Sequence, residues 1–136
     1  MNRSRHTKVF PDEHAEQAKL CKWLQIKNIE YAAVPNGMFI NLKGRSAGMI
    51  MAKMKEEGFR TGFPDIMVLL PGRVVFIEMK RVSKSRVSDE QKEWNAKLRT
   101  LGFDAYICKG FEAAASVIED IIAEELRKQR SGQEVT

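Results

Sequence analysis

The sequence predicts an α/β fold in which one mixed sheet of about four strands is flanked by helices. Segments with the spacing of amphipathic helices alternate with short apolar segments, in the order helix, strand, helix, strand, strand, helix, strand, helix. The length of 136 residues fits one compact domain, and a hydrophobic content of 43% supplies a core. Two successive strands near the middle are apolar at nearly every position, so we expect both faces of the sheet to be covered.

Capping or turn residues bound the expected elements. Asp12 is placed to cap the first helix, and Ser88 and Gln91 have the spacing of a capping box that starts the third. Leu101 and Leu126 end the apolar stripes of the last two helices, which we expect to be buried. The expected ranges are 12–27, 46–57, 88–101 and 114–126 for the helices and 31–34, 65–70, 74–80 and 103–108 for the strands.

The expected domain spans residues 11–127, between a flexible basic arm over residues 1–10 and a polar tail over residues 128–136. Lysine and arginine outnumber aspartate and glutamate by 23 to 18, giving a net charge of +5 that favours a polyanionic partner without identifying one. Cys21 and Cys108 are too few for a disulfide framework or a zinc cage, and we expect both to be buried free thiols.

The sequence also bears on location. No apolar stretch approaches the roughly 18 residues that a membrane span needs. The first residues lack the apolar run of a secretory signal. We therefore expect a protein that works in a reducing cytoplasm and contacts no membrane.

The two central strands carry the candidate chemistry. Pairing them symmetrically about the turn Pro71-Gly72 places Asp65 opposite Glu78. Opposed residues on one face of a sheet have Cβ atoms roughly 4.5 to 5.5 Å apart, near enough for two carboxylates to share a divalent cation. Two acids so placed repel each other unless a cation lies between them, whereas a structural pair would have opposite signs.

Lys80 lies two residues after Glu78, so the period of a strand puts both side chains on one face. Phosphodiester hydrolysis needs an attacking water, a cation that draws charge from the phosphate, and a group that orients or deprotonates the water. Asp65, Glu78 and Lys80 together meet these needs. Each alone has an ordinary explanation, as a turn residue or a solvated strand edge. Their meeting at one register favours a metal-dependent nuclease.

Gly62-Phe63-Pro64-Asp65 followed by Phe76-Ile77-Glu78-Met79-Lys80 resembles the signature of the PD-(D/E)xK nuclease superfamily. Within it, the sequence is most similar to the virus-type replication-repair nuclease module, VRR-NUC. Three further marks of that family have counterparts here, namely a glutamate in the first helix (Glu16), a Pro-Asn-Gly turn (Pro35-Asn36-Gly37) and a later glutamine (Gln91). The resemblance covers most of the chain, from about Glu16 to Lys109.

The resemblance implies a restriction-endonuclease-like core, dependence on Mg²⁺ or Mn²⁺, and catalytic roles for Asp65, Glu78 and Lys80. Glu16 and Gln91 would assist. Asp65, Glu78 and Glu16 would hold the metal, and Gln91 would orient water or a phosphate oxygen. Because Gln91 also belongs to the expected capping box, we expect its two roles to compete. Stand-alone members of the family are associated with viruses and bacteria, and they look like homodimers that act on branched DNA such as Holliday junctions. The resemblance therefore also implies a homodimer that acts on branched DNA in replication or repair.

Five cations are candidates for DNA contacts. Arg81, Lys84 and Arg86 lie between the candidate lysine and the next helix, where they would grip phosphates on either side of the cut. Without a site beside them they would form an ordinary solvated loop. Arg45 and Arg60 flank the helix over 46–57 and are further candidates.

Two other functions stay open from the sequence. A nuclease fold is sometimes retained as a non-catalytic nucleic-acid-binding module, but such relatives usually lose a metal ligand or the lysine, and this chain keeps them. A sequence-specific restriction enzyme is disfavoured because the chain has no evident room for a separate target-reading domain. The expected function is therefore a structure-selective DNA endonuclease.

Overall fold

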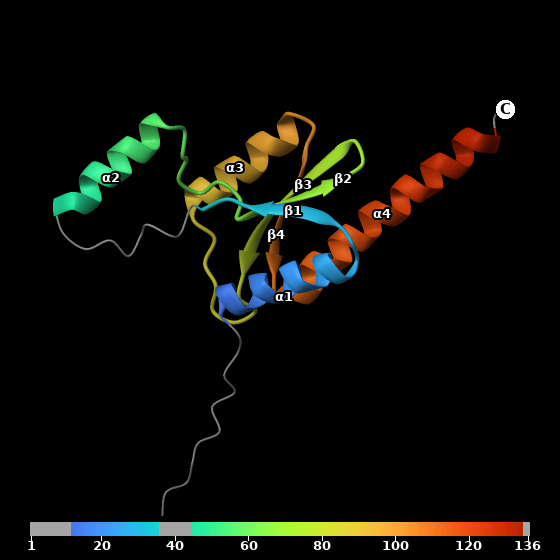
Figure 1. Ribbon diagram of the computed structural model, residues 1–136, viewed down its shortest axis with the longest axis horizontal. Helices are drawn as coiled ribbons and strands as arrows, with labels where there is room; N and C mark the ends of the chain where they lie inside the picture. The colour runs from blue at the N-terminus through green and yellow to red at the C-terminus, as the bar shows by residue number, and fades with distance from the viewer. Residues whose placement is uncertain (1–11, 36–44, 135–136) are drawn as a thin grey trace, which may run out of the picture.

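The fold is known from a computed structural model that describes residues 12–35 and 45–134, apart from the side chains of residues 45–47, 133 and 134. These residues form the helices α1 (Glu13–Ile26), α2 (Arg45–Glu56), α3 (Asp89–Thr100) and α4 (Phe111–Glu134), and the strands β1 (Glu30–Ala33), β2 (Ile66–Leu70), β3 (Arg73–Lys80) and β4 (Asp104–Lys109). The strands lie in the order β1-β2-β3-β4, with α1 and α4 over one face and α3 over the other (Figure 1). The expected α/β class, element order and mixed sheet are confirmed.

Strands β2 and β3 form the expected hairpin. The opposed pairs are Ile66–Ile77, Met67–Phe76, Val68–Val75, Leu69–Val74 and Leu70–Arg73. This is the register that symmetric pairing about Pro71-Gly72 predicts. Regular pairing of β2 with β3 ends one residue short of Asp65 and Glu78. The carbonyl of Asp65 faces β1, where it accepts a hydrogen bond of 2.8 Å from the amide of Val34.

Side chains of β3 alternate between two cores. The core under α1 and α4 contains Val75, Ile77 and Met79. The core under α3 contains Phe76, so the alternation places Glu78 and Lys80 on the α3 side of the sheet, where they are 4% and 6% exposed. Coverage of both faces is confirmed for this strand, whereas β1 at the edge of the sheet is largely exposed.

Several details differ from the sequence-based expectations. α4 continues to Glu134, through most of the stretch expected as a polar tail. Leu101 and Leu126 are 70% and 51% exposed, although their spacing placed them on buried faces. Cys108 is buried as expected, but Cys21 is only partly buried, and both are free thiols. Helical spacing gives the direction of a side chain and does not tell where the covering layer ends.

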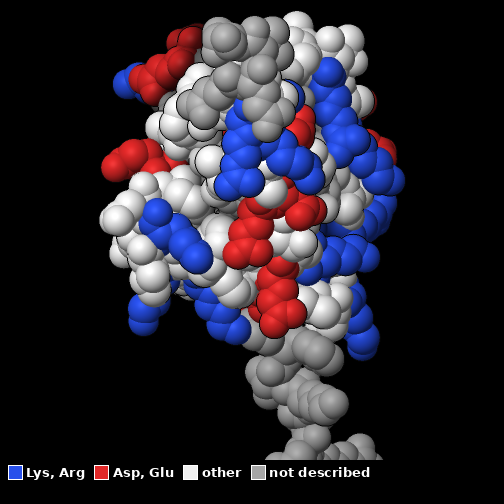
Figure 2. Space-filling model, turned by 90° about the vertical axis from the view of Figure 1, so that its right-hand side faces the viewer, with Lys and Arg blue, Asp and Glu red and all other residues white. Residues whose placement is uncertain are grey.

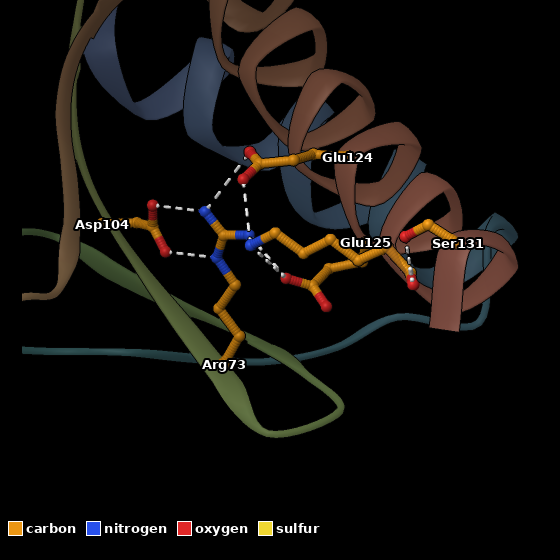
Figure 3. A network of polar contacts seen from close by, with 6 residues as sticks. Arg73, Asp104, Glu124, Glu125 and Ser131 are labelled. Atoms are coloured by element: carbon orange, nitrogen blue, oxygen red, sulfur yellow. Dashed lines mark hydrogen bonds and ion pairs between the residues drawn. The ribbon is translucent and has the colours of Figure 1, made fainter. Parts of the chain in front are cut away.

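A charged network fixes the middle of α4 to the start of β3 (Figure 3). Arg73 donates from Nε to Oδ2 of Asp104 at 2.6 Å and from Nη2 to Oδ1 at 2.9 Å, and its Nη1 donates to Glu125 at 2.7 Å. Glu124 and Lys128 complete the network. Opposite charges at this end of the sheet therefore satisfy one another.

Helix α2 stands apart from the sheet, beyond the beginning of α3 (Figure 1). It packs extensively against none of the other elements that the structure describes. Met49 and Met51 on this helix are 77% and 50% exposed. Within residues 12–35 and 45–134, neither this helix nor any other has the length and apolar character needed to cross a membrane.

Candidate active site

Asp65 is held beside the end of β3 by its own side chain. Its Oδ2 accepts a hydrogen bond of 2.8 Å from the backbone amide of Met79. Its carboxyl group also interacts with that of Glu78. Burial raises the pKa of Asp65, and the Met79 amide offsets part of this rise. The two acids that the sequence placed opposite each other are therefore brought together.

Glu78 is a buried acid with one satisfied oxygen. Its Oε1 accepts a hydrogen bond of 2.6 Å from Nε2 of Gln91, whereas its Oε2 is buried and has no hydrogen-bond partner among the residues described. Removal from water, followed by the neighbouring charge of Asp65, raises the pKa of Glu78 to about 9. A buried carboxylate oxygen without a partner is costly, so this position calls for a proton or a cation.

Gln91 performs two tasks with the two ends of its amide. Its Oε1 accepts a hydrogen bond of 2.9 Å from the amide of Ser88, and its own backbone amide donates to Oγ of Ser88 at 3.2 Å, which completes the capping box. Its Nε2 donates to Glu78. The cap uses the carbonyl oxygen and the contact with Glu78 uses the nitrogen, so the two contacts exist at the same time.

The loop that leads to Asp65 passes closely over the start of α3. A Cβ on Gly62 would lie 2.6 Å from the backbone carbon of Glu90 and 2.8 Å from the amide nitrogen of Gln91, and Gly62 has a φ of +83°. Both the available space and the backbone conformation therefore require glycine. This close passage brings Asp65 and Gln91 to Glu78 from two different elements.

Lys80 is paired with Glu13, a residue that the sequence reasoning missed. Its Nζ lies 3.7 Å from Oε1 of Glu13, at the first position of α1. The charge of Glu13 also reaches Asp65 and Glu78 and helps to raise the pKa of each. The available signal was helical spacing, because Glu13 lies three residues before Glu16 and hence on a similar face, nearer the beginning of the helix.

Glu16 has a different place. It is 5% exposed, and its Oε2 accepts a hydrogen bond from the amide of Phe111, the first residue of α4. Its carboxylate therefore satisfies an amide at the positive end of the α4 dipole. It does not line the cleft onto which Asp65 and Glu78 open. Glu13, in contrast, lines this cleft together with the two acids.

The cleft has a volume of about 460 Å³. Its polar lining includes Glu13, Asp65, Glu78 and Gln91, and its apolar lining comes from α2 and the segment that follows it. A family model described as the VRR-NUC domain matches residues 2–112, which include all of these positions. The chain belongs to the VRR-NUC family.

Solved structures agree with this assignment. One VRR_NUC domain protein shares 25% sequence identity at a TM-score of 0.59, with 82% of this chain and 88% of that chain covered. A second structure, a VRR_NUC domain, shares 20% identity at a TM-score of 0.55, with 79% and 94% covered, and supports the fold alone. No curated protein matches the sequence. The resemblance found in the sequence is confirmed.

Membership places the chain in a nuclease-type family whose members generally depend on divalent metals and whose domain suggests DNA as the substrate. Within the described ranges, no three His, Cys, Asp or Glu residues form a ready-made metal cluster. Two carboxylates do meet, and Mg²⁺ is commonly bound through one or two carboxylates and several waters. The unpartnered Oε2 of Glu78 is an oxygen donor of the kind that such an ion prefers. The VRR-NUC site therefore fits a hard divalent cation.

The cations expected to contact DNA lie in different settings. Arg60 lines the cleft, and Lys84 and Arg86 are exposed on the loop after β3. Arg81 donates from Nη2 to the carbonyl of Lys84 at 3.2 Å, so it also shapes that loop. Arg45 begins α2, but its side chain lies outside the described residues.

Lys109 is a further cation near the VRR-NUC site that the sequence reasoning missed. It pairs with Lys80 in the parallel register of β3 and β4, so both side chains leave the sheet on one face, and Lys109 is exposed. The expected mixed sheet allowed a parallel pair, but the register that places Lys109 beside Lys80 was not predicted. Figure 2 shows the side of the molecule toward which α4 extends, where acidic side chains form a band between basic ones. Positive charge is therefore mixed with negative charge on that side.

Proposed function

We propose that this VRR-NUC protein is an endonuclease that depends on Mg²⁺ or Mn²⁺ and hydrolyses phosphodiester bonds in DNA. The observation that carries the proposal is the pair formed by the partly buried Asp65 and the buried Glu78, with one unpartnered oxygen on Glu78 and with Lys80 beside it. Like charges so placed destabilise a purely structural site. A divalent cation bound between them would turn this destabilising pair into a ligand set.

Each side chain of the site has a separate task. Asp65 and Glu78 would hold the ion, and a bound divalent ion supplies a Lewis acid that neutralises phosphate charge and activates water. Gln91 keeps one oxygen of Glu78 in place, which leaves the other for the ion. Lys80, held at the end of β3, orients the attacking water and stabilises negative charge on the phosphate.

Glu13 takes the part that the sequence-based interpretation gave to Glu16. Glu13 lies beside Lys80, lines the cleft and is half-exposed, so it is placed to bind the ion through water. We expect Glu13→Gln to lower cleavage by about 10-fold or more and to raise the metal concentration required. Glu16→Gln should instead lower thermal stability, because the α4 cap weakens, and leave the metal requirement unchanged. Equal metal dependence in the two variants would contradict this assignment.

The preferred substrate is proposed to be branched DNA, such as a Holliday junction, during viral or bacterial replication or repair in the cytoplasm. A homodimer would bring two sites to one junction. Arg60 in the lining of the cleft, exposed Lys84 and Arg86 on the loop after β3, and exposed Lys109 at the end of β4 would hold phosphates on either side of the cut. Light scattering of the purified chain measures its mass, and a monomer at all concentrations would remove the dimer from the proposal.

A cleavage assay tests the proposal directly. Supercoiled plasmid and a four-way junction are incubated with the protein and Mg²⁺, Mn²⁺ or EDTA. We expect cleavage with either ion, none with EDTA, and faster cutting of the junction than of unbranched duplex. Binding without cleavage under every metal condition would identify a non-catalytic nucleic-acid-binding module instead. Discrete fragments from unbranched DNA would identify a restriction enzyme.

A further inference from the structure

An apolar wall adjoins the candidate catalytic residues within one cleft. Met51, Met54 and Phe59 line the cleft together with Asp65 and Glu78. Met51 is 50% exposed, and Met54 and Phe59 are partly exposed. A second hollow of about 400 Å³ shares Phe59 with the first, so this ring lies where the two meet. Apolar side chains gathered next to a polar site and open to water indicate a binding surface.

The position of Phe59 is built into the backbone. Gly58 has a φ of +99° after the last turn of α2, and the amide of Phe59 donates to the carbonyl of Met54 at 3.0 Å. This C-terminal turn brings Phe59 back beside the end of the helix. The backbone of this turn therefore places Phe59 next to the last turn of α2.

The size of the cleft limits what binds there. A volume of about 460 Å³ falls within the range of roughly 300 to 1,000 Å³ that is typical of small-molecule sites. One nucleotide fits such a space, whereas a continuous duplex does not enter it. An aromatic ring with methionines beside it suits the flat face of a base, and such stacking accepts any base. Lys55 and Arg60 in the lining supply positive charge for the adjoining phosphates.

We propose that the surface formed by Met51, Met54 and Phe59 receives one unpaired nucleobase next to the phosphate that is cut. This inference rests on the proposed nuclease function and specifies its substrate class as DNA with a base already free of its partner. Moving a base out of a stacked pair costs energy, and this cost is least for an unpaired base. The protein would therefore select distorted or branched DNA through one nucleotide, whatever its sequence.

A second copy of the chain is a poorer occupant of this surface. The apolar wall and the acids share one cleft, so a protein segment that filled it would also cover Asp65 and Glu78. A base that enters from the substrate strand instead places its own phosphate beside those acids. Continuity of the cleft with the candidate catalytic residues therefore favours the substrate.

Three duplexes that differ at one position test the proposal. The first is fully paired, the second carries a single unpaired nucleotide, and the third carries an abasic analogue at that unpaired position. The last two share a flexible backbone and differ only in the base. With the full chain and Mn²⁺, we expect cutting beside the unpaired nucleotide to be about 10-fold faster than beside the abasic analogue. Equal rates would overturn the proposal.

Variants test whether the difference between the two cutting rates depends on the apolar wall formed by Met51, Met54 and Phe59. We expect Phe59→Ala to bring the ratio of the two rates close to one and Phe59→Trp to retain it, since tryptophan also stacks. Met51→Ala should lower the ratio and is tolerated by the fold because Met51 is exposed. Leu101→Ala, a change at an exposed apolar residue outside the cleft, should keep the ratio. An unchanged ratio in both Phe59→Ala and Met51→Ala would overturn the proposal, and loss of a dimer in its place would assign the wall to a second copy.

A binding measurement separates this inference from the proposed function. The unpaired position carries 2-aminopurine, and the full-length Lys80→Ala variant is added in EDTA. We expect stacking on Phe59 to change the fluorescence and Phe59→Ala in the same background to remove the change. If the wild-type protein cuts none of the DNAs with any metal, the nuclease proposal fails while this measurement still decides the base site. An unchanged signal when DNA is bound would overturn the base site alone.

Discussion

The two ends of strand β3 differ in how the charged groups there are paired. At its first residue, Arg73 meets Asp104 and Glu125 in hydrogen bonds of 2.6 to 2.9 Å, so opposite charges satisfy one another (Figure 3). Near its last residue, Glu78 meets Asp65, and one carboxylate oxygen has no partner among the described residues. The pKa of Asp104 is lowered by Arg73, whereas burial raises that of Glu78.

This difference separates a site that the chain completes by itself from one that needs something added. The Arg73 network holds α4 against the sheet and has no need of a ligand. The Asp65–Glu78 pair is held by the Met79 amide and by Gln91, which fix the repelling groups together. Holding like charges together costs stability, and proteins accept such costs at functional sites.

The largest contrast is expected in catalysis. Lys80→Ala should lower the cleavage rate by at least about 100-fold, because it removes the cation that, in the proposed mechanism, lies beside the reacting phosphate. Arg73→Met should lower the free energy of unfolding by about 1 to 3 kcal/mol, since it leaves Asp104 and Glu125 without their partner in a partly solvated network. Single-turnover cleavage of labelled DNA and thermal denaturation measure the two effects. Full activity in folded Lys80→Ala would remove Lys80 from the mechanism.

Gln91→Ala is expected to have the next largest effect. It removes the donor that holds Oε1 of Glu78, the proposed metal ligand, and loss of a contact that supports a metal ligand typically costs about 10- to 100-fold in activity or metal affinity. Ser88→Ala is the matched control, because it breaks the capping box, at a cost of about 1 kcal/mol, and keeps the Gln91–Glu78 contact. A titration of Mn²⁺ against the cleavage rate separates the two. Equal loss of metal affinity in both variants would show that Gln91 acts only through the helix cap and not through its contact with Glu78.

The sequence predicts most of the framework because local chemistry specifies it. The hairpin register follows from Pro71-Gly72, and with it the meeting of Asp65 and Glu78. The cap of α3 follows from Ser88 and Gln91. These contacts join residues close in sequence or strands joined by a short turn, where few arrangements are possible.

Contacts between distant elements were not predictable in the same way. The choice between Glu13 and Glu16 depends on where α4 begins relative to α1, since the amide of Phe111 takes up Glu16. The position of Lys109 beside Lys80 depends on parallel pairing of β3 with β4. Helical and strand periods give the face on which a side chain lies and leave its distant neighbour undetermined.

The two ends of β3 should also respond differently to pH. Without metal, Glu78 ionises in the unfolded chain near its ordinary pKa of 4.5 and in the folded chain at about 9, so the folded state binds the additional proton between these values. Stability from this group is full below the lower value and falls as pH rises through the window. Asp104 has the opposite sign, since its lowered pKa gives stability that is lost as pH falls below its ordinary value of 3.8.

Thermal denaturation in EDTA between pH 5 and 9 measures this loss of stability. The pH range is chosen because it lies between the ordinary pKa of Glu78, 4.5, and its pKa in the folded protein, about 9. We expect the melting temperature of the wild type to fall with rising pH and that of Glu78→Gln to fall less. Glu93→Gln, a change at an exposed glutamate of α3, is the matched control and should follow the wild type. Identical curves for all three proteins would show that Glu78 is already ionised in the folded protein at neutral pH.

The smallest effect is expected from an exposed cation that belongs to neither of the two charged groups on β3. Arg86 lies exposed on the loop after that strand, so Arg86→Ala should weaken DNA binding similarly for every sequence and reduce the slope of log affinity against log salt by about 1. Arg127→Ala is the matched control, because Arg127 is exposed on the distal half of α4, on the opposite side of the molecule from α2 (Figure 1). Anisotropy titrations from low to physiological salt measure both slopes. If the two variants lose the same slope, the DNA contacts α4 as well, and the charged network at Arg73 would then hold a second binding surface in addition to supporting the fold.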